Sequence, residues 1–285
     1  MVARLVDVPA SGAPALAEVL ARRELEPYIS LRDRDLAGRV DGLFVAEGEV
    51  VVRVLASPRQ TRFRVRSLLV EQRRVGAIRD VIDALPDEVP VYVVAQPVMD
   101  AIVGFAIHRG ILGLGERGTP LSPESLLTGG GLAVGLVGLT NHDNVGSVFR
   151  SAAAFGARGV LLDAATCDPL YRKAIRVSVG GALVMPFARC ASGDAMLDTV
   201  VAAGWEALAL SARGEETLDA VVSETTSAKG RVLLLGTEGE GLPAHLLSRA
   251  RRVRIDMTPT LDSLNVAVAT GIALYEATRP RRSRD

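Results

Sequence analysis

Cysteine is scarce in this sequence of 285 residues, in which Cys167 and Cys190 are the only two. Neither thiol belongs to a CxxC pair, and neither lies near a histidine at the spacing of metal ligands. A disulfide framework and a zinc site are therefore disfavoured. We expect no bound metal and a reducing compartment.

Long apolar runs and an excess of charge of one sign are also missing. No segment reaches the roughly 20 consecutive apolar residues that a membrane-spanning helix needs, and the first residues do not have the pattern of a secretion signal. The 33 basic residues balance the 33 acidic ones, so the net charge indicates neither a nucleic acid nor a membrane as partner. We expect a globular cytoplasmic protein.

A segment rich in glycine, proline and serine, residues 115–132, separates two halves of the chain. Such a composition is typical of a domain boundary rather than of packed structure. We therefore predict an N-terminal domain over residues 1–118, a linker over 119–131 and a second domain over 132–285. Each half is long enough to bury a core of its own.

Short apolar runs alternate with helical patterns in both halves, which predicts an α/β layer structure. In the first half, strands are expected at 42–46, 67–70, 89–94 and 110–115, with helical patterns at 49–55 and 74–85. In the second half, strands are expected at 132–139, 159–163, 206–210, 231–236 and 252–256, and a final helix within 263–280. The second set does not alternate polar and apolar residues, as expected for strands buried on both faces of a largely parallel sheet.

The hexapeptide GLGERG, residues 113–118, has the spacing of a dinucleotide-binding glycine motif. That motif requires a helix that opens at its third glycine, with its N-terminus facing the pyrophosphate. Pro120 and Pro123 follow here instead, and the apolar stretch about 20 residues further on offers no acid for a ribose. A nicotinamide-dependent oxidoreductase is therefore a weak alternative.

Three clusters of polar residues follow apolar segments of the second half. The first lies within residues 140–157 and places Asn144 where it can cap a helix that begins near Val145. Arg150 stands on the first turns of this helix, opposite its apolar side. Open α/β folds bind ligands at this edge of the sheet, although a plain surface arginine gives the same pattern.

The second cluster is the loop after the apolar run 231–236, with Gly236, Glu238, Gly239, Glu240 and Gly241. Its glycines let the backbone turn sharply and approach a ligand closely. The two glutamates would repel a polyphosphate, so the loop suits a positively charged ligand or one read by backbone groups. A simple strand-to-helix turn is the alternative.

The third cluster precedes the final helix. Ser263 is a natural N-cap for that helix. Asn265 is expected inside the first turn, where asparagine is a mediocre helix former. The amide of Asn265 is therefore a candidate for ligand recognition.

Arginine-rich segments supply candidates for contacts with phosphate. Residues 53–79 carry eight arginines and a single acid, Glu71, and a shorter basic segment begins at residue 172. The candidates are Arg59, Arg62, Arg64, Arg172 and Arg176. A solvated face explains such runs equally well. A further basic run occupies residues 249–254, and another forms the C-terminal tail.

The segments NVGSVFRSAAAFGA, LLGTEGEGL and IDMTPTLDSLNVAVATGIALYEA occur in this order. They closely resemble the three motifs of the SpoU/TrmH branch of the SPOUT RNA methyltransferases, over about residues 130–280. The first half resembles, more loosely, the ribosomal-protein-like RNA-binding domain that often precedes this catalytic domain. The resemblance implies an α/β SPOUT domain with a C-terminal trefoil knot, S-adenosylmethionine bound in the knot, a smaller α/β RNA-binding domain before it, and a homodimer formed through the C-terminal domain.

Carried over position by position, the resemblance also assigns roles to single residues. The catalytic set is Arg150, Asn144, Glu238, Ser263 and Asn265. The set that binds S-adenosylmethionine is Leu210, Gly236, Ile255, Met257 and Leu264.

The implied reaction transfers a methyl group from S-adenosylmethionine to a ribose 2′-hydroxyl of structured RNA. Ribosomal RNA is the favoured substrate because the first half resembles ribosomal RNA binders, and transfer RNA is the alternative. A guanidinium is not deprotonated in proteins, so we expect Arg150 to grip a phosphate and stabilise the 2′-oxygen rather than to act as the base. A non-catalytic RNA-binding or ribosome-assembly factor with the same fold is the runner-up.

Overall fold

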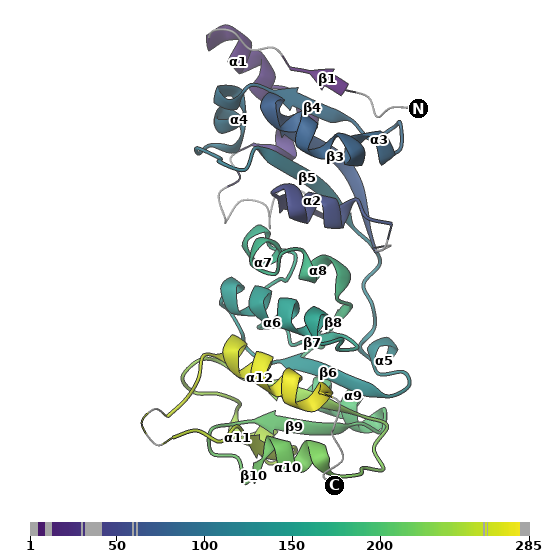
Figure 1. The fold of residues 1–285 in the computed structure, drawn as a ribbon, viewed down its shortest axis with the longest axis vertical. Helices are drawn as coiled ribbons and strands as arrows, with labels where there is room; N and C mark the ends of the chain where they lie inside the picture. Colours follow the sequence, from purple (N-terminus) through teal and green to yellow (C-terminus); the bar gives the residue numbers. More distant parts are fainter. Residues whose placement is uncertain are drawn as a thin grey trace. The chain divides into compact units, whose positions relative to one another are not determined.

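The computed structural model describes residues 5–8, 13–29, 31, 42–58, 60, 62–258, 260 and 262–279. The chain divides into two compact units, each with its own sheet (Figure 1). Unit 1 takes in residues 1–119 and 170–184, and unit 2 takes in residues 120–169 and 185–285. Among the helices of the described ranges, none is long and apolar enough to span a bilayer.

Unit 1 contains a five-stranded mixed sheet in the order β1-β4-β3-β5-β2. Its strands are β1 (Leu5–Asp7), β2 (Leu43–Glu47), β3 (Phe63–Glu71), β4 (Val91–Val94) and β5 (Ile111–Arg117). β1, β4 and β3 run parallel, whereas β5 is antiparallel to both of its neighbours. All four strands expected in this half are present. β5 continues to Arg117 without a helix at Gly118, so the helix that the dinucleotide motif requires does not form there.

Helices cover both faces of the unit 1 sheet. A buried core lies between the strands and α1 (Ala13–Leu20), the 3₁₀ helix η1 (Arg23–Tyr28) and α4 (Gln96–Val103). α2 (Glu49–Leu55) packs against β5 and contacts η3 (Gln72–Ile78), which continues into α3 (Arg79–Ala84). α7 (Arg172–Val177) contacts β2, and α8 (Gly181–Val184) contacts α2. The expected helix at 49–55 is therefore confirmed, whereas the pattern at 74–85 forms the end of a 3₁₀ helix followed by a short α-helix.

Unit 2 contains a seven-stranded sheet in the order β10-β12-β9-β11-β6-β7-β8. Its strands are β6 (Gly131–Leu136), β7 (Val160–Leu162), β8 (Phe187–Arg189), β9 (Glu206–Leu210), β10 (Glu216–Thr217), β11 (Gly230–Leu235) and β12 (Arg251–Arg254). Every pair is parallel, so the predicted parallel sheet is confirmed. β8 and β10 were not expected, because their residues, Phe-Ala-Arg and Glu-Thr, do not form an apolar run.

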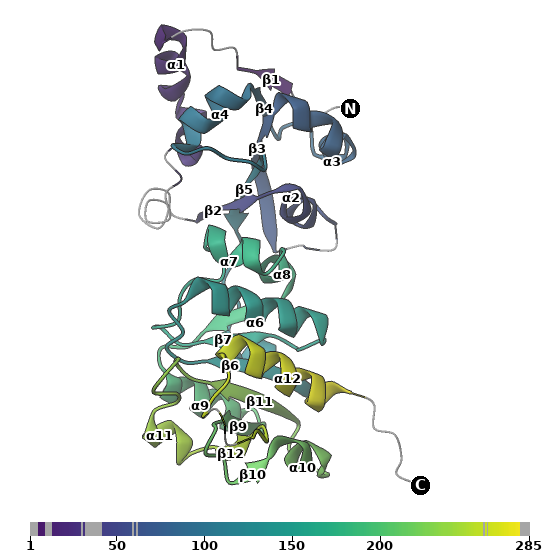
Figure 2. The same cartoon turned by 60° about the vertical axis from the view of Figure 1, so that its left-hand side comes forward.

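The two faces of this sheet carry different helices. α5 (Pro123–Leu126), α9 (Gly193–Ala202) and α11 (Ala244–Leu247) enclose one apolar core, in which Trp205 Nε1 donates a hydrogen bond to Leu127 O at 2.9 Å. α6 (His142–Ala154) and α12 (Val266–Thr278) lie side by side on the other face (Figures 1 and 2). α10 (Leu218–Ser223) contacts α12.

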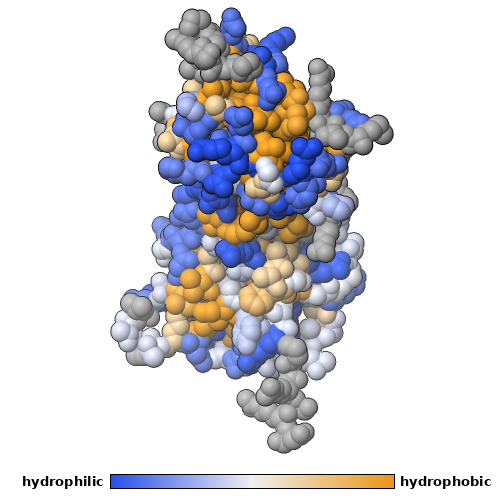
Figure 3. Space-filling model, turned by 45° about the horizontal axis from the view of Figure 1, so that its top comes forward, coloured by the Kyte–Doolittle hydropathy of each residue, from blue (hydrophilic) through white to orange (hydrophobic). Residues whose placement is uncertain are grey.

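One side of α12 remains open to solvent. Val268, Ile272 and Tyr275 are 53%, 41% and 54% exposed. Their spacing of four and three residues places them on one face of the helix. Figure 3 shows, in orange, where apolar side chains reach the surface of the molecule.

The segment predicted as a linker is partly packed. The first boundary between the units falls after residue 119, one residue beyond the predicted end of the first domain, but residues 170–184, which we placed in the second domain, belong to unit 1. α5 forms inside the predicted linker, and Leu126 and Leu127 are buried in the core of unit 2. Pro123, which suggested an open linker, is instead the first residue of this short helix, and Pro120 and the glycines at 129–131 lie on either side of it.

The basic run 249–254 is engaged in ion pairs of unit 2. Arg251 contacts the carboxylates of Glu206, Glu216 and Glu224. Its hydrogen bonds hold the pKa of Glu216 and Glu224 below the usual range. The other pairs are Arg249 with Asp194 and Asp198, Arg252 with Glu215, and Arg254 with Asp256. This run therefore has a structural explanation, whereas the basic tail, residues 280–285, lies outside the described residues.

Candidate active site

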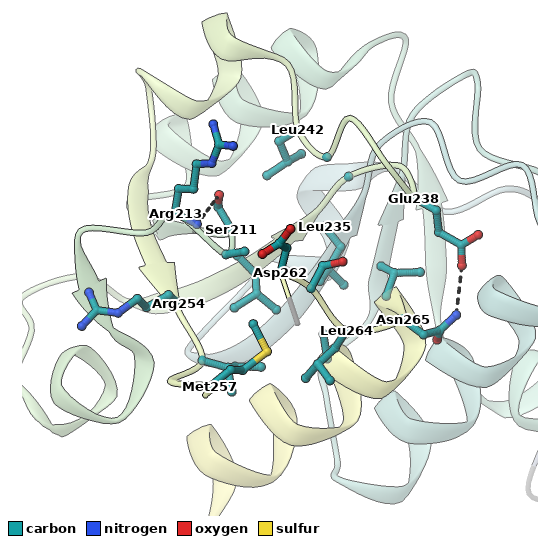
Figure 4. Close-up of a pocket in the computed structure, with 18 of the residues that line it drawn as sticks. Ser211, Arg213, Leu235, Glu238, Leu242, Arg254, Met257, Asp262, Leu264 and Asn265 are labelled. Carbon is teal, nitrogen blue, oxygen red and sulfur yellow. Dashed lines mark hydrogen bonds between the residues drawn. The ribbon is translucent and has the colours of Figure 1, made fainter. Parts of the chain in front are cut away.

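A cleft of about 1190 Å³ opens at the carboxyl ends of β9, β11 and β12 (Figure 4). Parallel strands present their carboxyl ends at one edge of a sheet, where open α/β folds bind ligands. The cleft is lined by all five residues expected to bind the cofactor, Leu210, Gly236, Ile255, Met257 and Leu264. Glu238, Ser263 and Asn265 line it as well.

α6 begins earlier than we predicted. Its N-cap is Asn141, whose backbone is extended and whose Oδ1 accepts a hydrogen bond from Asp143 N at 2.8 Å. The expectation that Asn144 caps this helix is therefore wrong. Asn144 lies on the first turn instead, and only 7% of it is exposed. Its side-chain amide thus needs partners within the protein.

α12 begins two residues later than we predicted. Asn265 is its N-cap, and its Oδ1 accepts hydrogen bonds from Ala267 N at 2.9 Å and Val268 N at 3.3 Å. The prediction that Ser263 caps the helix is wrong, because Ser263 still precedes the helix and lines the cleft. The cap uses the carbonyl oxygen of the Asn265 amide and leaves its NH₂ group for other partners.

Asn144, Glu238 and Asn265 form one hydrogen-bonded network. Asn144 Nδ2 donates to Glu238 Oε1. Asn265 Nδ2 donates to the same Glu238 oxygen at 2.9 Å and to Asn144 Oδ1 at 3.1 Å. The network joins the start of α6, the loop after β11 and the start of α12. Three of the five predicted catalytic residues are therefore in direct contact.

The loop after β11 is held in a narrow turn. Thr237 and Gly241 exchange backbone hydrogen bonds at 3.2 and 3.1 Å, and Gly239 and Gly241 adopt positive φ values. A Cβ atom on Gly236 would lie 2.2 Å from the carbonyl carbon of Gly241 and 2.3 Å from Leu242 N. Glycine at position 236 is therefore required by the contact between the two ends of the loop.

Charges of both signs surround the cleft. Arg252 and Arg254 line it, but each pairs with an acid, Glu215 and Asp256 respectively. Arg213 also lines the cleft and is exposed. Figure 4 shows Arg213 and Arg254 at one end and Glu238 with Asn265 at the other.

Arg150 is exposed on α6, as predicted, with Val148 and Ala152 buried on the opposite side. Among the described residues that line the cleft, Arg150 is absent. The structure thus brings four of the five predicted catalytic residues to the cleft or into contact with it, and it leaves Arg150 apart from them within one chain.

The candidates for RNA contact lie in unit 1. Arg62 stands over the Phe63 ring at 5.2 Å, and burial lowers the pKa of its guanidinium. Arg64 is exposed on β3. Arg172 and Arg176 both contact the carboxylate of Glu47. Arg59 lies outside the described residues. Their roles as RNA contacts stay predictions.

Sequence reasoning missed several residues of the site. Asn141 is the cap of α6, and Arg213 and Asp262 line the cleft. A signal existed for Asp262, which stands next to Ser263 in the third motif. Nothing in the sequence distinguishes Arg213 from other surface arginines.

Neither cysteine is suited to act as a nucleophile. Burial raises the pKa of Cys167 and of Cys190 to about 11. Because the thiolate is the reactive form, both side chains are thiols at neutral pH. Within the described ranges, no group of three or more His, Cys, Asp or Glu side chains could hold a metal ion.

The fold of the chain matches solved structures of methyltransferases. An S-adenosylmethionine-bound rRNA methyltransferase from Sinorhizobium meliloti is 25% identical, with a TM-score of 0.71, over 96% of this chain and 97% of that one. The SpoU methyltransferase AviRb from Streptomyces viridochromogenes, in complex with S-adenosylmethionine, is 24% identical, with a TM-score of 0.75, over 90% and 97% of the two chains. These likenesses define an α/β methyltransferase fold with a largely parallel sheet.

Sequence comparison gives the family. A profile of the SpoU rRNA methylase family matches residues 131–275. A protein of Mycobacterium bovis named an uncharacterized tRNA/rRNA methyltransferase is 37% identical over 239 residues, which are 83% of this chain and 81% of its own. The chain belongs to the SpoU rRNA methylase family, as the three motifs indicated.

The network predicts that Glu238 contributes to stability. Glu238→Ala removes the acceptor of the Asn144 amide, which is buried, and should lower the free energy of unfolding by about 1–3 kcal/mol. Glu240→Ala in the same loop is the matched control and should change it by less than about 0.5 kcal/mol. Urea denaturation measures both. Equal stability of the two variants would show that the network does not hold the loop.

Proposed function

We propose that this protein transfers a methyl group from S-adenosylmethionine to a ribose 2′-hydroxyl of RNA, with ribosomal RNA as the favoured substrate, and that it acts as a homodimer. The threading of its C-terminal segment into a trefoil knot belongs to the same proposal. The observation that carries it is the contact of Asn144, Glu238 and Asn265 beside a cleft at the carboxyl edge of the parallel sheet. Membership of the SpoU family supports RNA as the substrate.

The residues of the cleft fit S-adenosylmethionine. Met257 and Leu264 expose apolar side chains there, 38% and 37% accessible, which suits the adenine ring. Asp262 and Glu240 match its positive charge, and Arg213 suits its carboxylate. When bound, the cofactor supplies a sulfonium-activated methyl group, so the protein itself must mainly position the acceptor oxygen and assist the loss of one proton.

The polar residues divide this work. Arg150 carries a fixed positive charge, which can grip an RNA phosphate and stabilise negative charge on the 2′-oxygen. Glu238 already accepts two hydrogen bonds from asparagine amides. It therefore orients Asn144 and Asn265 rather than acting as the base. A phosphate oxygen of the substrate or a water is left to receive the proton.

A second copy of the chain explains the isolated position of Arg150. Arg150 is exposed on α6, outside the cleft, and α6 lies beside α12. The exposed apolar face of α12, formed by Val268, Ile272 and Tyr275, is the kind of surface that a dimer buries. Pairing of two chains through these helices would bring the arginine of one chain to the cleft of the other.

The test of this function uses S-adenosylmethionine with an isotopically labelled methyl group and RNA from cells that lack the gene. Digested nucleosides are then analysed by mass spectrometry. Label in a 2′-O-methylnucleoside of ribosomal RNA is the expected result. Label on a base would overturn the acceptor, and label only in transfer RNA would overturn the substrate.

Arg150→Ala should lower the rate of methyl transfer by at least about a hundredfold and leave the calorimetric affinity for S-adenosylmethionine unchanged, because the proposed partners of Arg150 are an RNA phosphate and the 2′-oxygen rather than the cofactor. A mixture of Arg150→Ala and Asn265→Ala chains should regain up to roughly a quarter of the wild-type rate, since half of the dimers would hold one intact site of two. No recovery on mixing would contradict an arginine supplied by the second chain.

Gly236→Ala should weaken S-adenosylmethionine binding at least about tenfold, or about 1.4 kcal/mol, because its Cβ collides with the backbone of Gly241 and Leu242. Isothermal titration calorimetry measures the affinity. Gly76→Ala is the control, since no atom lies within 4 Å of its added Cβ. Wild-type affinity of the first variant would remove the loop after β11 from the cofactor site.

Ile272→Glu should convert a dimer into a monomer, because it places a charge in the apolar face of α12. Val201→Glu, on α9, changes an apolar residue that is 65% exposed and should leave the dimer intact. Analytical ultracentrifugation distinguishes the two states. A dimer that persists in Ile272→Glu would place the interface elsewhere.

A further inference from the structure

Two buried carboxylates stand at one edge of the unit 1 sheet. β2 ends at Glu47 and β3 ends at Glu71, and both strands are antiparallel to β5. Their ends therefore flank the start of β5: Gly48 N donates to Ile111 O at 2.9 Å, and Glu71 N donates to Gly110 O at 2.8 Å. The side chains of Glu47 and Glu71 are only 6% and 4% exposed.

Three arginines from two separate segments converge on Glu47. Arg172 of α7 forms a hydrogen bond with Glu47 Oε2. Arg176, one turn further on, lies 3.5 Å from the same oxygen, and Arg109, just before β5, lies 4.0 Å from Glu47 Oε1. Gly48 leaves space for Arg109, because a Cβ there would lie 3.0 Å from Arg109 Cδ.

These arginines differ in how firmly they are held. Arg172 is 11% exposed, donates to Leu31 O at 3.1 Å and stands over the Phe105 ring at 5.3 Å. Arg109 and Arg176 are 51% and 35% exposed, and their contacts with Glu47 are longer than a strong charge-assisted hydrogen bond. Arg172 alone thus neutralises Glu47, and the other two keep donors for a ligand.

The neighbouring Glu71 adds one more pair, because Arg73 Nε donates to its carboxylate at 3.0 Å while the Arg73 side chain is 77% exposed. We call Arg73, Arg109, Arg172 and Arg176, with Glu47 and Glu71, the edge cluster. Four guanidinium groups face two carboxylates in it, which leaves two positive charges in excess. Arg74 and Asp100, which adjoin the same loop, add one charge of each sign.

We propose that the edge cluster binds phosphate groups of the RNA substrate. The buried pair of Glu47 and Arg172 supports the site, and Arg109 and Arg176 contact the phosphates. A lone buried carboxylate needs one partner to offset its desolvation. Further guanidinium groups around it repel one another unless an anion is added. A guanidinium fork matches the oxygens of a phosphate, and RNA supplies phosphates at regular intervals.

The proposal rests on RNA as the substrate and is independent of which RNA atom is methylated. The experiment therefore measures RNA binding without S-adenosylmethionine. Fluorescence anisotropy of a short labelled RNA hairpin is recorded over a series of KCl concentrations. Because each lost phosphate contact lowers the slope of log affinity against log salt by about 0.7–0.9, Arg109→Ala/Arg176→Ala should lower that slope by about 1.4–1.8.

Two control variants make the result decisive. Arg53→Ala/Arg79→Ala removes the same charge from unit 1, but both arginines pair with acids outside the edge cluster, so the slope should change much less. Arg109→Lys/Arg176→Lys keeps the charges and should keep the slope. Equal slopes for the two alanine variants would overturn the proposal, and a wild-type slope in Arg109→Ala/Arg176→Ala would do the same. The proposed function is tested separately by the methyl-transfer experiment, and the atom methylated there does not affect this binding measurement.

Discussion

One carboxylate, Glu238, joins the parts of the chain that form the candidate site. It accepts hydrogen bonds from Asn144, 94 positions earlier, and from Asn265, 27 positions later. Asn265 in turn fixes the first turn of α12 through its other amide atom. The start of each helix and the turn after β11 are therefore interdependent. A change at any one of these three segments therefore affects the other two.

The parallel sheet could be predicted because its strands are uniform apolar runs, as in β11, where Val232 to Leu235 are buried without interruption. The capping residues could not be chosen correctly. Asn141 and Asn144, like Ser263 and Asn265, are each competent caps, and the choice depends on which backbone is extended after folding. The residues predicted to bind the cofactor line the cleft, because Leu210, Gly236 and Ile255 end or directly follow strands of the predicted sheet.

No pattern in the sequence indicated that residues 170–184 pack in unit 1. This segment connects β7 to β8 of unit 2, yet Arg172 pairs with Glu47, 125 positions earlier. A buried carboxylate is costly without a partner, so Glu47 explains why a helix with this arginine packs against β2. Long-range ion pairs of this kind leave no periodicity from which the contact could be inferred.

The arginines differ in how many carboxylates pair with them. This difference matters more for phosphate binding than the number of arginines does. The arginines of the run 249–254 form ion pairs with acids of unit 2, so little of their positive charge is left for a ligand. Among the described residues, no acid forms an ion pair with Arg150, and Arg109 and Arg176 share one carboxylate that Arg172 already satisfies. An RNA phosphate binds where positive charge exceeds negative charge. Arg150 on α6 and the edge cluster at the end of β2 meet that condition, whereas the run 249–254 does not.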